Sequence, residues 1–223
     1  MKNKLILALP LAGIALVLAS CGDKTTSETT TTESNNNNTI VYSNETYYAS
    51  PNGVASANGT KGSPVDIRTG FNKLKAGDTL ILLDGTYNLP ERILIDKTQN
   101  GASGHMITVK ADDNANVTLD FSQQNIAGTS RGVQINADYW HLYGFDVKGA
   151  GDNGVYIAGS YNIVENCSFH ENQDTGLQIG RASSDLTNIK DWPHNNLIKN
   201  CTSYNNYDYQ SYGENADGFA AKL

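Results

Sequence analysis

Gly132-Val133-Gln134-Ile135 is the first copy of a short repeated pattern. The pattern returns as Gly154-Val155-Tyr156-Ile157 and Gly176-Leu177-Gln178-Ile179, so successive glycines lie 22 residues apart. A fourth copy begins at Gly218, one period and an insertion of 20 residues later. Each copy alternates inward apolar and outward residues, as a strand with one buried face does. A repeat of this length with two or three short strands predicts an all-β fold, a right-handed parallel β-helix.

A second strand repeats alongside the first. Residues 140–147 and 162–169 align at the same offset of 22, and residues 196–201 follow after an offset of 34. The extra residues predict a loop around 181–195 and a smaller one around 205–215. Equivalent positions stack in such a solenoid, which predicts an asparagine ladder from Asn166 to Asn200 and two interior ladders. The interior ladders are Val133, Val155, Leu177 and Phe219, and Ile135, Ile157, Ile179 and Ala221.

The start of this domain predicts a cap. Ile67, Phe71 and Leu74 share one face of a helix within residues 64–74, and a strand follows at 79–83. Further strand cores are expected at Ile93, 107–109 and 117–119. A helix here would cover the exposed end of the first coil. The repeat is still running at Leu223, so we expect residues 41–223 to be a β-helix domain whose C-terminal coils are missing from this chain.

The N-terminal residues predict export. Lys2 and Lys4 precede an apolar run at 5–19, and the run ends in Leu-Ala-Ser-Cys at 18–21. This resembles a bacterial lipoprotein signal peptide over residues 1–20, with Cys21 as the lipidation site; an ordinary signal peptide with a chance cysteine is the alternative. Residues 21–40 are rich in Thr and Asn and predict a flexible tether. We therefore expect a cell-envelope lipoprotein outside the cytoplasm that touches the membrane only through its lipid.

The composition narrows the range of partners. A formal net charge of −7 argues against nucleic acid, because no basic patch could neutralise a row of phosphates. An acidic protein can bind an acidic polymer when a cation bridges them. The chain has no zinc-type Cys/His spacing, no phosphate-binding loop and no G-x-S-x-G motif. We expect a monomer.

Two groups of residues carry a likeness to a known family. The first group lies at 47–53, 58–64 and 76–87, and the second is Asp174-Thr175-Gly176-Leu177-Gln178-Ile179-Gly180 with residues 214–223, ENADGFAAKL. Together they resemble polysaccharide lyase family 9, the pectate lyases and their relatives, over residues 47–223. The resemblance implies β-elimination of polygalacturonate, or pectate, by a site that holds Ca²⁺ with several aspartates and uses a lysine as the base.

The resemblance assigns one metal ligand to this chain. Asp217 matches the first calcium aspartate of the family, whereas the other aspartates and the lysine base belong to later coils. No catalytic residue is therefore assigned, and the chain is expected to be inactive alone. Ca²⁺ takes six to eight oxygen ligands, so a single aspartate would bind it weakly. Without the resemblance, Asp217 reads as a turn residue that bonds its own backbone.

Other residues have two interpretations each. Arg181, with Trp192 and His194, could line a sugar-binding wall or simply pack the long loop. Lys222 could contact a substrate carboxylate or lie solvated on the surface. Asp152 and Asp174 both lie two residues before a repeat glycine and are interpreted first as turn residues.

Cys167 and Cys201 stack on adjacent coils, where they could form a disulfide or, as we favour, a ladder of free thiols. Two alternatives to a lyase stay open at this level. An inverting glycoside hydrolase of similar shape would need a cluster of aspartates, and a non-catalytic β-helix would only hold polysaccharide.

Overall fold

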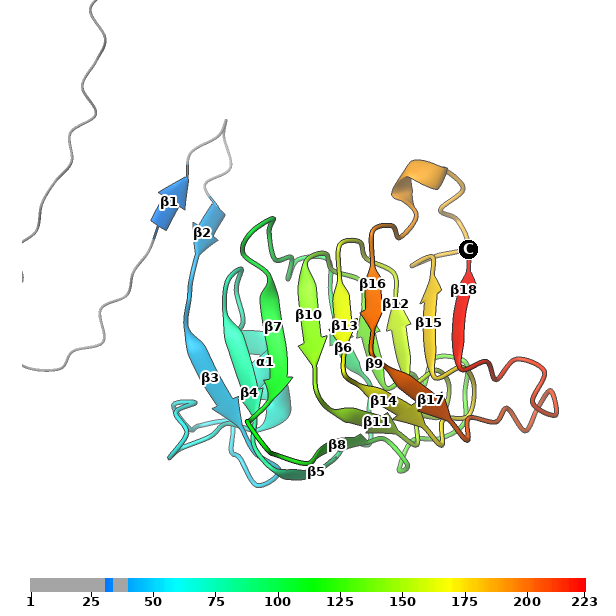
Figure 1. The fold of residues 1–223 in the computed structure, drawn as a ribbon, viewed down its shortest axis with the longest axis horizontal. Coiled ribbons are helices and arrows are strands. Elements are labelled where there is room, and N and C mark those ends of the chain that lie inside the picture. Colours follow the sequence, from blue (N-terminus) through cyan, green and yellow to red (C-terminus); the bar gives the residue numbers. More distant parts are fainter. Residues whose placement is uncertain (1–30, 34–39) are drawn as a thin grey trace, which may run out of the picture.

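The chain folds as a parallel β-helix in a computed structural model that describes residues 31–33 and 40–223 (Figure 1). Three parallel sheets run along its axis. Sheet 1 contains β3 (Thr46–Ala49), β4 (Thr79–Leu82), β7 (Ile107–Ala111), β10 (Trp140–Tyr143), β13 (Ile163–Glu165) and β16 (Leu197–Lys199). Sheet 2 contains β5 (Gly85–Asn88), β8 (Val117–Asp120), β11 (Asp146–Lys148), β14 (Ser168–His170) and β17 (Thr202–Tyr204). Sheet 3 contains β6 (Ile93–Ile95), β9 (Val133–Ile135), β12 (Val155–Ile157), β15 (Leu177–Gly180) and β18 (Phe219–Lys222).

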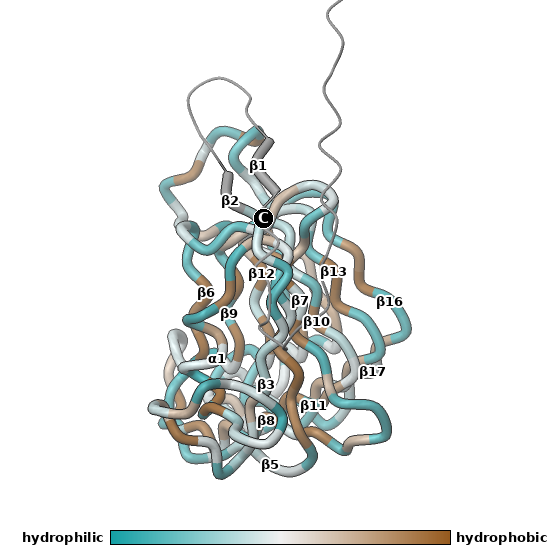
Figure 2. The backbone as a smooth tube through the Cα atoms, turned by 90° about the vertical axis from the view of Figure 1, so that its left-hand side faces the viewer, coloured by the Kyte–Doolittle hydropathy of each residue, from teal (hydrophilic) through white to brown (hydrophobic). Residues whose placement is uncertain are grey.

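The strand registers confirm the predicted repeat. Val155 pairs with Val133 and Leu177, and Leu177 pairs with Phe219, so the first interior ladder forms as expected. The second ladder pairs Ile157 with Ile135 and Ile179 in the same way. Figure 2 shows hydrophobic residues recurring along the stacked strands. Because most inward strand positions lie above an apolar neighbour, one continuous core fills the solenoid.

The repeat glycines are required by close packing at the bend between sheets 2 and 3. A Cβ on Gly132 would lie 2.4 Å from the carbonyl oxygen of Gly154. A Cβ on Gly154 would lie 2.7 Å from the carbonyl oxygen of Gly176 and 2.6 Å from Nδ2 of Asn172. Any side chain here would push adjacent coils apart, which explains why glycine opens the first three copies of the pattern, at 132, 154 and 176.

The predicted asparagine ladder at Asn166 and Asn200 is wrong. Both residues are exposed and have left-handed backbone angles, with φ of 54° and 52°, so they serve as bend residues. The ladders lie at other corners, where inward side chains bond along the stack. Oδ1 of Asn162 accepts from the backbone N–H of Trp140 at 2.8 Å, and the Asn162 N–H donates to Oδ1 of Asn196 at 2.9 Å.

The second asparagine ladder has the same form. Asn172 accepts from the N–H of Ala150 at 3.0 Å, and the Asn172 N–H donates to Oδ1 of Asn206 at 3.1 Å. Asn162 and Asn172 are almost completely buried, so these amides satisfy backbone donors that the corner would otherwise leave unpaired.

The predicted cap is confirmed as helix α1 (Ile67–Lys73). Asp66 caps its N-terminus by accepting from the N–H of Thr69 at 3.0 Å. Ile67, Phe71 and Leu74 are buried against the first coils. The helix therefore closes the end of the core at which sheet 1 begins.

Both predicted insertions project from the solenoid. The first contains a short 3₁₀ helix, η1 (Ile189–Asp191), and the second follows β17 (orange and red in Figure 1). At the other end, β1 (Thr31–Glu33) pairs antiparallel with β2 (Ile40–Tyr42), within and beside the predicted tether. The signal peptide and Cys21 lie outside the described residues. In the part of the chain that the structure describes, no helix is long and apolar enough to cross a membrane.

Candidate functional site

The outer face of sheet 3 carries a polar strip. Strand alternation turns the middle residues of β9, β12 and β15 outward: Gln134, Tyr156 and Gln178. Gln134 accepts from Nη1 of Arg92 at 3.1 Å and donates to Oδ1 of Asn136 at 3.0 Å. These bonds fix a row of polar groups across the coils, which suits an extended polar ligand.

Asp152 lies at the centre of this strip, in the bend before β12. Its Oδ2 lies 3.4 Å from Nε of Arg131, and the Arg131 guanidinium lies 3.5 Å from the ring centre of Tyr156. Burial and the negative charge of Asp174 raise the pKa of Asp152 to about 6, although Arg131 acts in the opposite direction. Interpreting Asp152 as a turn residue did not predict its contact with Arg131, because a turn residue need not be buried.

Asp152→Asn is expected to stabilise the protein at neutral and alkaline pH. Because its pKa is higher in the folded than in the unfolded state, folding takes up a proton between about pH 4 and pH 6, and stability falls as the pH rises through that window. The neutral amide of asparagine does not ionise, so the variant does not lose stability as the pH rises. We expect a gain of about 1–2 kcal/mol at pH 8 that disappears near pH 4, after discounting for partial exposure and the lost Arg131 pair.

Urea unfolding at pH 4 and pH 8 measures this effect, with the exposed Asp185→Asn as the matched control. If Asp152→Asn were destabilising by the same amount at both pH values, attraction to Arg131 would outweigh the burial penalty and this account of Asp152 would be incorrect.

Asp217 and Lys222 lie together at the last described coil. Lys222 Nζ is 3.1 Å from Asp217 Oδ2 and also donates to the carbonyl oxygen of Asn215 at 3.1 Å. Asp217 follows Asn153 and Thr175 in the stack, but its side chain is 50% exposed, whereas those two residues are buried. The predicted ligand and the predicted substrate contact thus form one surface ion pair at the edge of the polar strip.

The residues around Asp217 do not by themselves fit a calcium ion. Within residues 31–33 and 40–223, no group of three or more His, Cys, Asp or Glu side chains could hold a metal. Asp217 supplies one carboxylate, and its nearest charged partner is a cation. Ca²⁺ needs six to eight oxygen ligands, so no reaction step is assigned to it here.

Arg181 is held inside the long loop. Its Nη1 donates to the carbonyl oxygens of Ser184 and Leu186, at 3.3 and 3.2 Å, and its guanidinium lies 5.3 Å from the ring centre of Trp192. Trp192 and His194 line a cleft that Arg181 does not line. The three residues of the predicted sugar-binding wall are therefore neighbours, but Arg181 positions the loop and the other two face the cleft.

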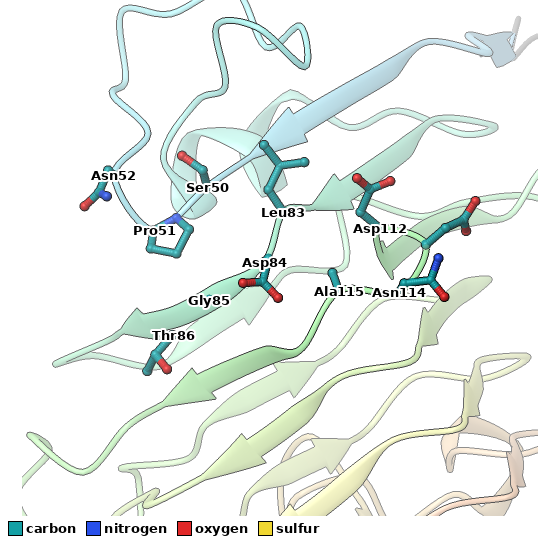
Figure 3. A pocket seen from close by; sticks show the side chains of 11 residues that line it. Ser50, Pro51, Asn52, Leu83, Asp84, Gly85, Thr86, Asp112, Asn114 and Ala115 are labelled. Carbon is teal, nitrogen blue, oxygen red and sulfur yellow. The ribbon is translucent and has the colours of Figure 1, made fainter.

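Another hollow lies far from these residues, near the N-terminal coils (Figure 3). It is an open cleft of about 720 Å³ lined by turns that include Asp84 and Asp112. Lys61 Nζ lies 2.6 Å from Asp112 and holds the pKa of that carboxyl below its usual value, while Asp84 accepts from the N–H of Asn116 at 2.8 Å. The cleft has no aromatic wall, so we do not assign substrate binding to it.

Cys167 and Cys201 are free thiols, in agreement with the thiol-ladder interpretation. A hydrogen bond with Cys201, together with burial, raises the pKa of Cys167. Cys167 therefore behaves as a small core residue.

Comparison with known proteins identifies the fold family. Residues 47–223 match the family model described as Pel9A-like, right handed beta helix region. The chain belongs to this family. It is 42% identical over 176 residues to pectate lyase L of Paenibacillus polymyxa (strain SC2), covering 79% of this chain and 39% of that protein. It is 33% identical over 183 residues to pectate lyase L of Dickeya chrysanthemi, covering 79% and 41%.

Solved structures agree with the Pel9A-like assignment. The crystal structure of pectate lyase Pel9A matches with a TM-score of 0.69 and 32% identity, over 78% of this chain and 43% of that one. A rhamnogalacturonan lyase matches with a TM-score of 0.55 and 20% identity, which shows the shared fold. The resemblance to polysaccharide lyase family 9 is thereby confirmed. This Pel9A-like chain spans about two fifths of the length of the two curated relatives.

Sequence reasoning missed Arg131 as a site residue of this Pel9A-like β-helix. The available signal was its position: Arg131 directly precedes Gly132, as Asn153 precedes Gly154 and Asp217 precedes Gly218. A polar or charged residue at one corner of successive coils therefore marks the polar strip.

Proposed function

We propose that this chain forms the N-terminal coils of a lyase that cleaves pectate, or a related acidic polysaccharide, by β-elimination. The observation that carries the proposal is the family match over residues 47–223, together with the 32% identity to the Pel9A crystal structure. The relatives at 42% and 33% identity are themselves named pectate lyases.

The proposed reaction requires a base and stabilisation of a carbanion. The base removes the proton on C5 of a uronate unit, the electron pair forms the C4–C5 double bond, and the glycosidic oxygen leaves C4 and gains a proton. The C6 carboxylate resists the extra negative charge, so a cation beside it lowers the barrier. We propose that Ca²⁺ supplies this stabilisation in the intact site and that Asp217 contributes one ligand.

The described residues would bind the polymer rather than break it. Lys222 lies on the outer surface beside Asp217 and could exchange that partner for a substrate carboxylate. Arg181 would contact the polymer from the long loop. The polar strip around Gln134 and Gln178 would offer amide groups to the sugar hydroxyls. We propose that residues 22–223 alone do not catalyse elimination, because they hold one carboxylate of the proposed calcium site and no assigned base.

We further propose that the protein is exported and anchored through a lipid on Cys21, as a monomer whose β-helix faces polysaccharide outside the cytoplasm. The support is the apolar run that ends in Leu-Ala-Ser-Cys at 18–21. Radiolabelled palmitate incorporated into the wild type, and absent from Cys21→Ala, is the expected outcome of a labelling experiment.

Elimination is measured by the ultraviolet absorbance of the C4–C5 double bond on polygalacturonate, with calcium and with a chelator. We expect no product from residues 22–223 and calcium-dependent product after fusion to the remaining coils of Pel9A. Product from residues 22–223 alone would show that they contain a complete site. A folded fusion that binds polygalacturonate without cleaving it would favour the non-catalytic alternative.

A further inference from the structure

A second polar cleft lies at the opposite end of the sheet 3 strands from Asp217. It has a volume of about 220 Å³ and opens where β6, β9 and β12 turn toward sheet 1. Its floor is formed by residues 158–160, and one wall is the inserted loop that carries η1, Trp192 and His194. The same loop is the orange projection beyond the strand ends in Figure 1. Loop and coils together thus enclose a site that neither forms alone.

Two lysines in this cleft have no partner. Across residues 31–33 and 40–223, four lysine side chains have no hydrogen bond, ion pair or aromatic contact: Lys75, Lys97, Lys110 and Lys190. Lys97 comes from the turn after β6, and Lys190 comes from η1 on the loop. Both line the same cleft although they are far apart in sequence. The cleft is also lined by Asp191, next to Lys190, and by Asp138, whose Oδ1 accepts from the N–H of Ser160 at 2.6 Å. The two lysines therefore bind an anionic ligand in competition with these carboxylates.

The aromatic wall is built on strained backbone. Tyr139 and Tyr161 occupy the same corner of adjacent coils and stack with ring centres 4.8 Å apart and planes 2° from parallel. Both have left-handed angles, with φ of 61° and 60°, which bulky residues rarely adopt. The equivalent residue one coil later is Asn195, an ordinary residue for this conformation. The tyrosines therefore occupy a corner where asparagine would be less strained.

The aromatic groups are held in place. Tyr161 is 39% exposed, and His194 meets its ring edge-on at 5.1 Å. Trp192 is fixed by a hydrogen bond from its Nε1 to the carbonyl oxygen of Leu186 at 2.8 Å. The apolar C–H face of a pyranose ring packs on fixed aromatic surfaces of this kind.

Amide groups complete the cleft. The side-chain oxygen of Asn100 accepts from the N–H of Asp138 at 2.9 Å, and that of Asn136 accepts from Gln134 at 3.0 Å. Both amides are oriented by these bonds, and neither NH₂ group donates to another part of the described chain. They remain available to the hydroxyl and ring oxygens of a sugar.

We propose that this cleft is a calcium-independent subsite for one uronate unit of an acidic polysaccharide. Lys97 and Lys190 bind the sugar carboxylate, the amides of Asn100 and Asn136 bind its oxygens, and Trp192 and Tyr161 contact the ring. The bond between Gln134 and Asn136 links the cleft to the polar strip, so one polymer chain can follow both. The choice of a uronate polymer rests on the proposed function; the lysines, amides and aromatic groups are features of the cleft itself.

The test is calorimetric titration of the full chain with trigalacturonate in the presence of a calcium chelator. We expect Lys97→Ala with Lys190→Ala to weaken binding roughly tenfold, and Trp192→Ala to weaken it to a similar extent. The matched control is Lys75→Ala with Lys110→Ala, which removes the same charge elsewhere and should change affinity by less than about twofold. All four lysines are outside the buried core, and thermal unfolding checks that each variant is folded.

Three outcomes would overturn the proposal: no binding by the wild type in chelator, equal losses in both lysine pairs, or equally tight binding of a neutral galactose trimer. The result is separable from the proposed function, because the titration excludes calcium and does not use Asp217. If the Pel9A fusion shows no elimination activity while the full chain still binds trigalacturonate in chelator, only the lyase proposal is rejected. An active fusion whose titration shows no uronate binding would reject only the subsite.

Discussion

Trp140→Ala is expected to lower the free energy of unfolding by about 3–5 kcal/mol, the range for removing a large buried aromatic side chain. Trp140 is fully buried, and its ring lies parallel to that of Phe71 with centres 6.0 Å apart. Its Nε1 also donates to the carbonyl oxygen of Gln99 at 2.7 Å. Alanine would leave a cavity between helix α1 and sheet 1 and would remove the hydrogen bond to the part-buried Gln99 carbonyl.

Urea unfolding followed by far-ultraviolet circular dichroism measures this loss. Trp192→Ala is the matched control because the same side chain is removed from the projecting loop, where the cost should be about 1 kcal/mol or less. Equal losses in the two variants would contradict the view that the cap and the first coils form a single core.

Asp217→Asn is expected to reduce elimination by the Pel9A fusion by about a hundredfold or more at low calcium, because a neutral amide is a weaker ligand and leaves Lys222 without its anion. The role of Asp217 also predicts a shift in calcium dependence. The variant should need more calcium for half-maximal activity, and added calcium should restore part of the rate.

Asp185→Asn is the control for this experiment, since Asp185 is an exposed residue of the loop that follows β15. A turn residue at position 217 would affect stability without moving the calcium titration. An unchanged calcium requirement in Asp217→Asn would therefore reject the ligand assignment and favour the turn interpretation.

The repeat could be predicted from sequence because its physical requirements are local. Glycine is imposed at 132, 154 and 176 by carbonyl contacts between coils, and an apolar residue follows each glycine because that position points inward. The spacing alone then sets the register of sheet 3. The same argument predicted α1, whose buried residues recur at helical spacing.

The corners were harder to predict because asparagine serves two purposes there. Asn166 adopts the left-handed bend and points outward, whereas Asn162, four residues earlier, points inward, and its side chain bonds to the preceding coil. Both residues are asparagines that recur with the period of the coils, so only the backbone angle distinguishes the bend residue from the ladder residue. This is why the ladder was assigned to the wrong asparagine.

The site could be predicted only in outline. Arg131 meets Asp152 and Tyr156 through contacts between neighbouring coils, so its role depends on burial as well as register. Lys97 and Lys190 share a cleft only because the long loop folds back over the strand ends. A spacing argument could place the loop in the chain but could not say which coils it covers.

The most direct test of the lyase account is the mass of the oligosaccharides that the Pel9A fusion releases from polygalacturonate in ¹⁸O-labelled water. β-Elimination predicts unsaturated products, each lighter by one water than a hydrolytic product, with no ¹⁸O incorporated at the cleavage site. Saturated products with ¹⁸O at the new reducing end would contradict the account and identify a glycoside hydrolase of similar fold.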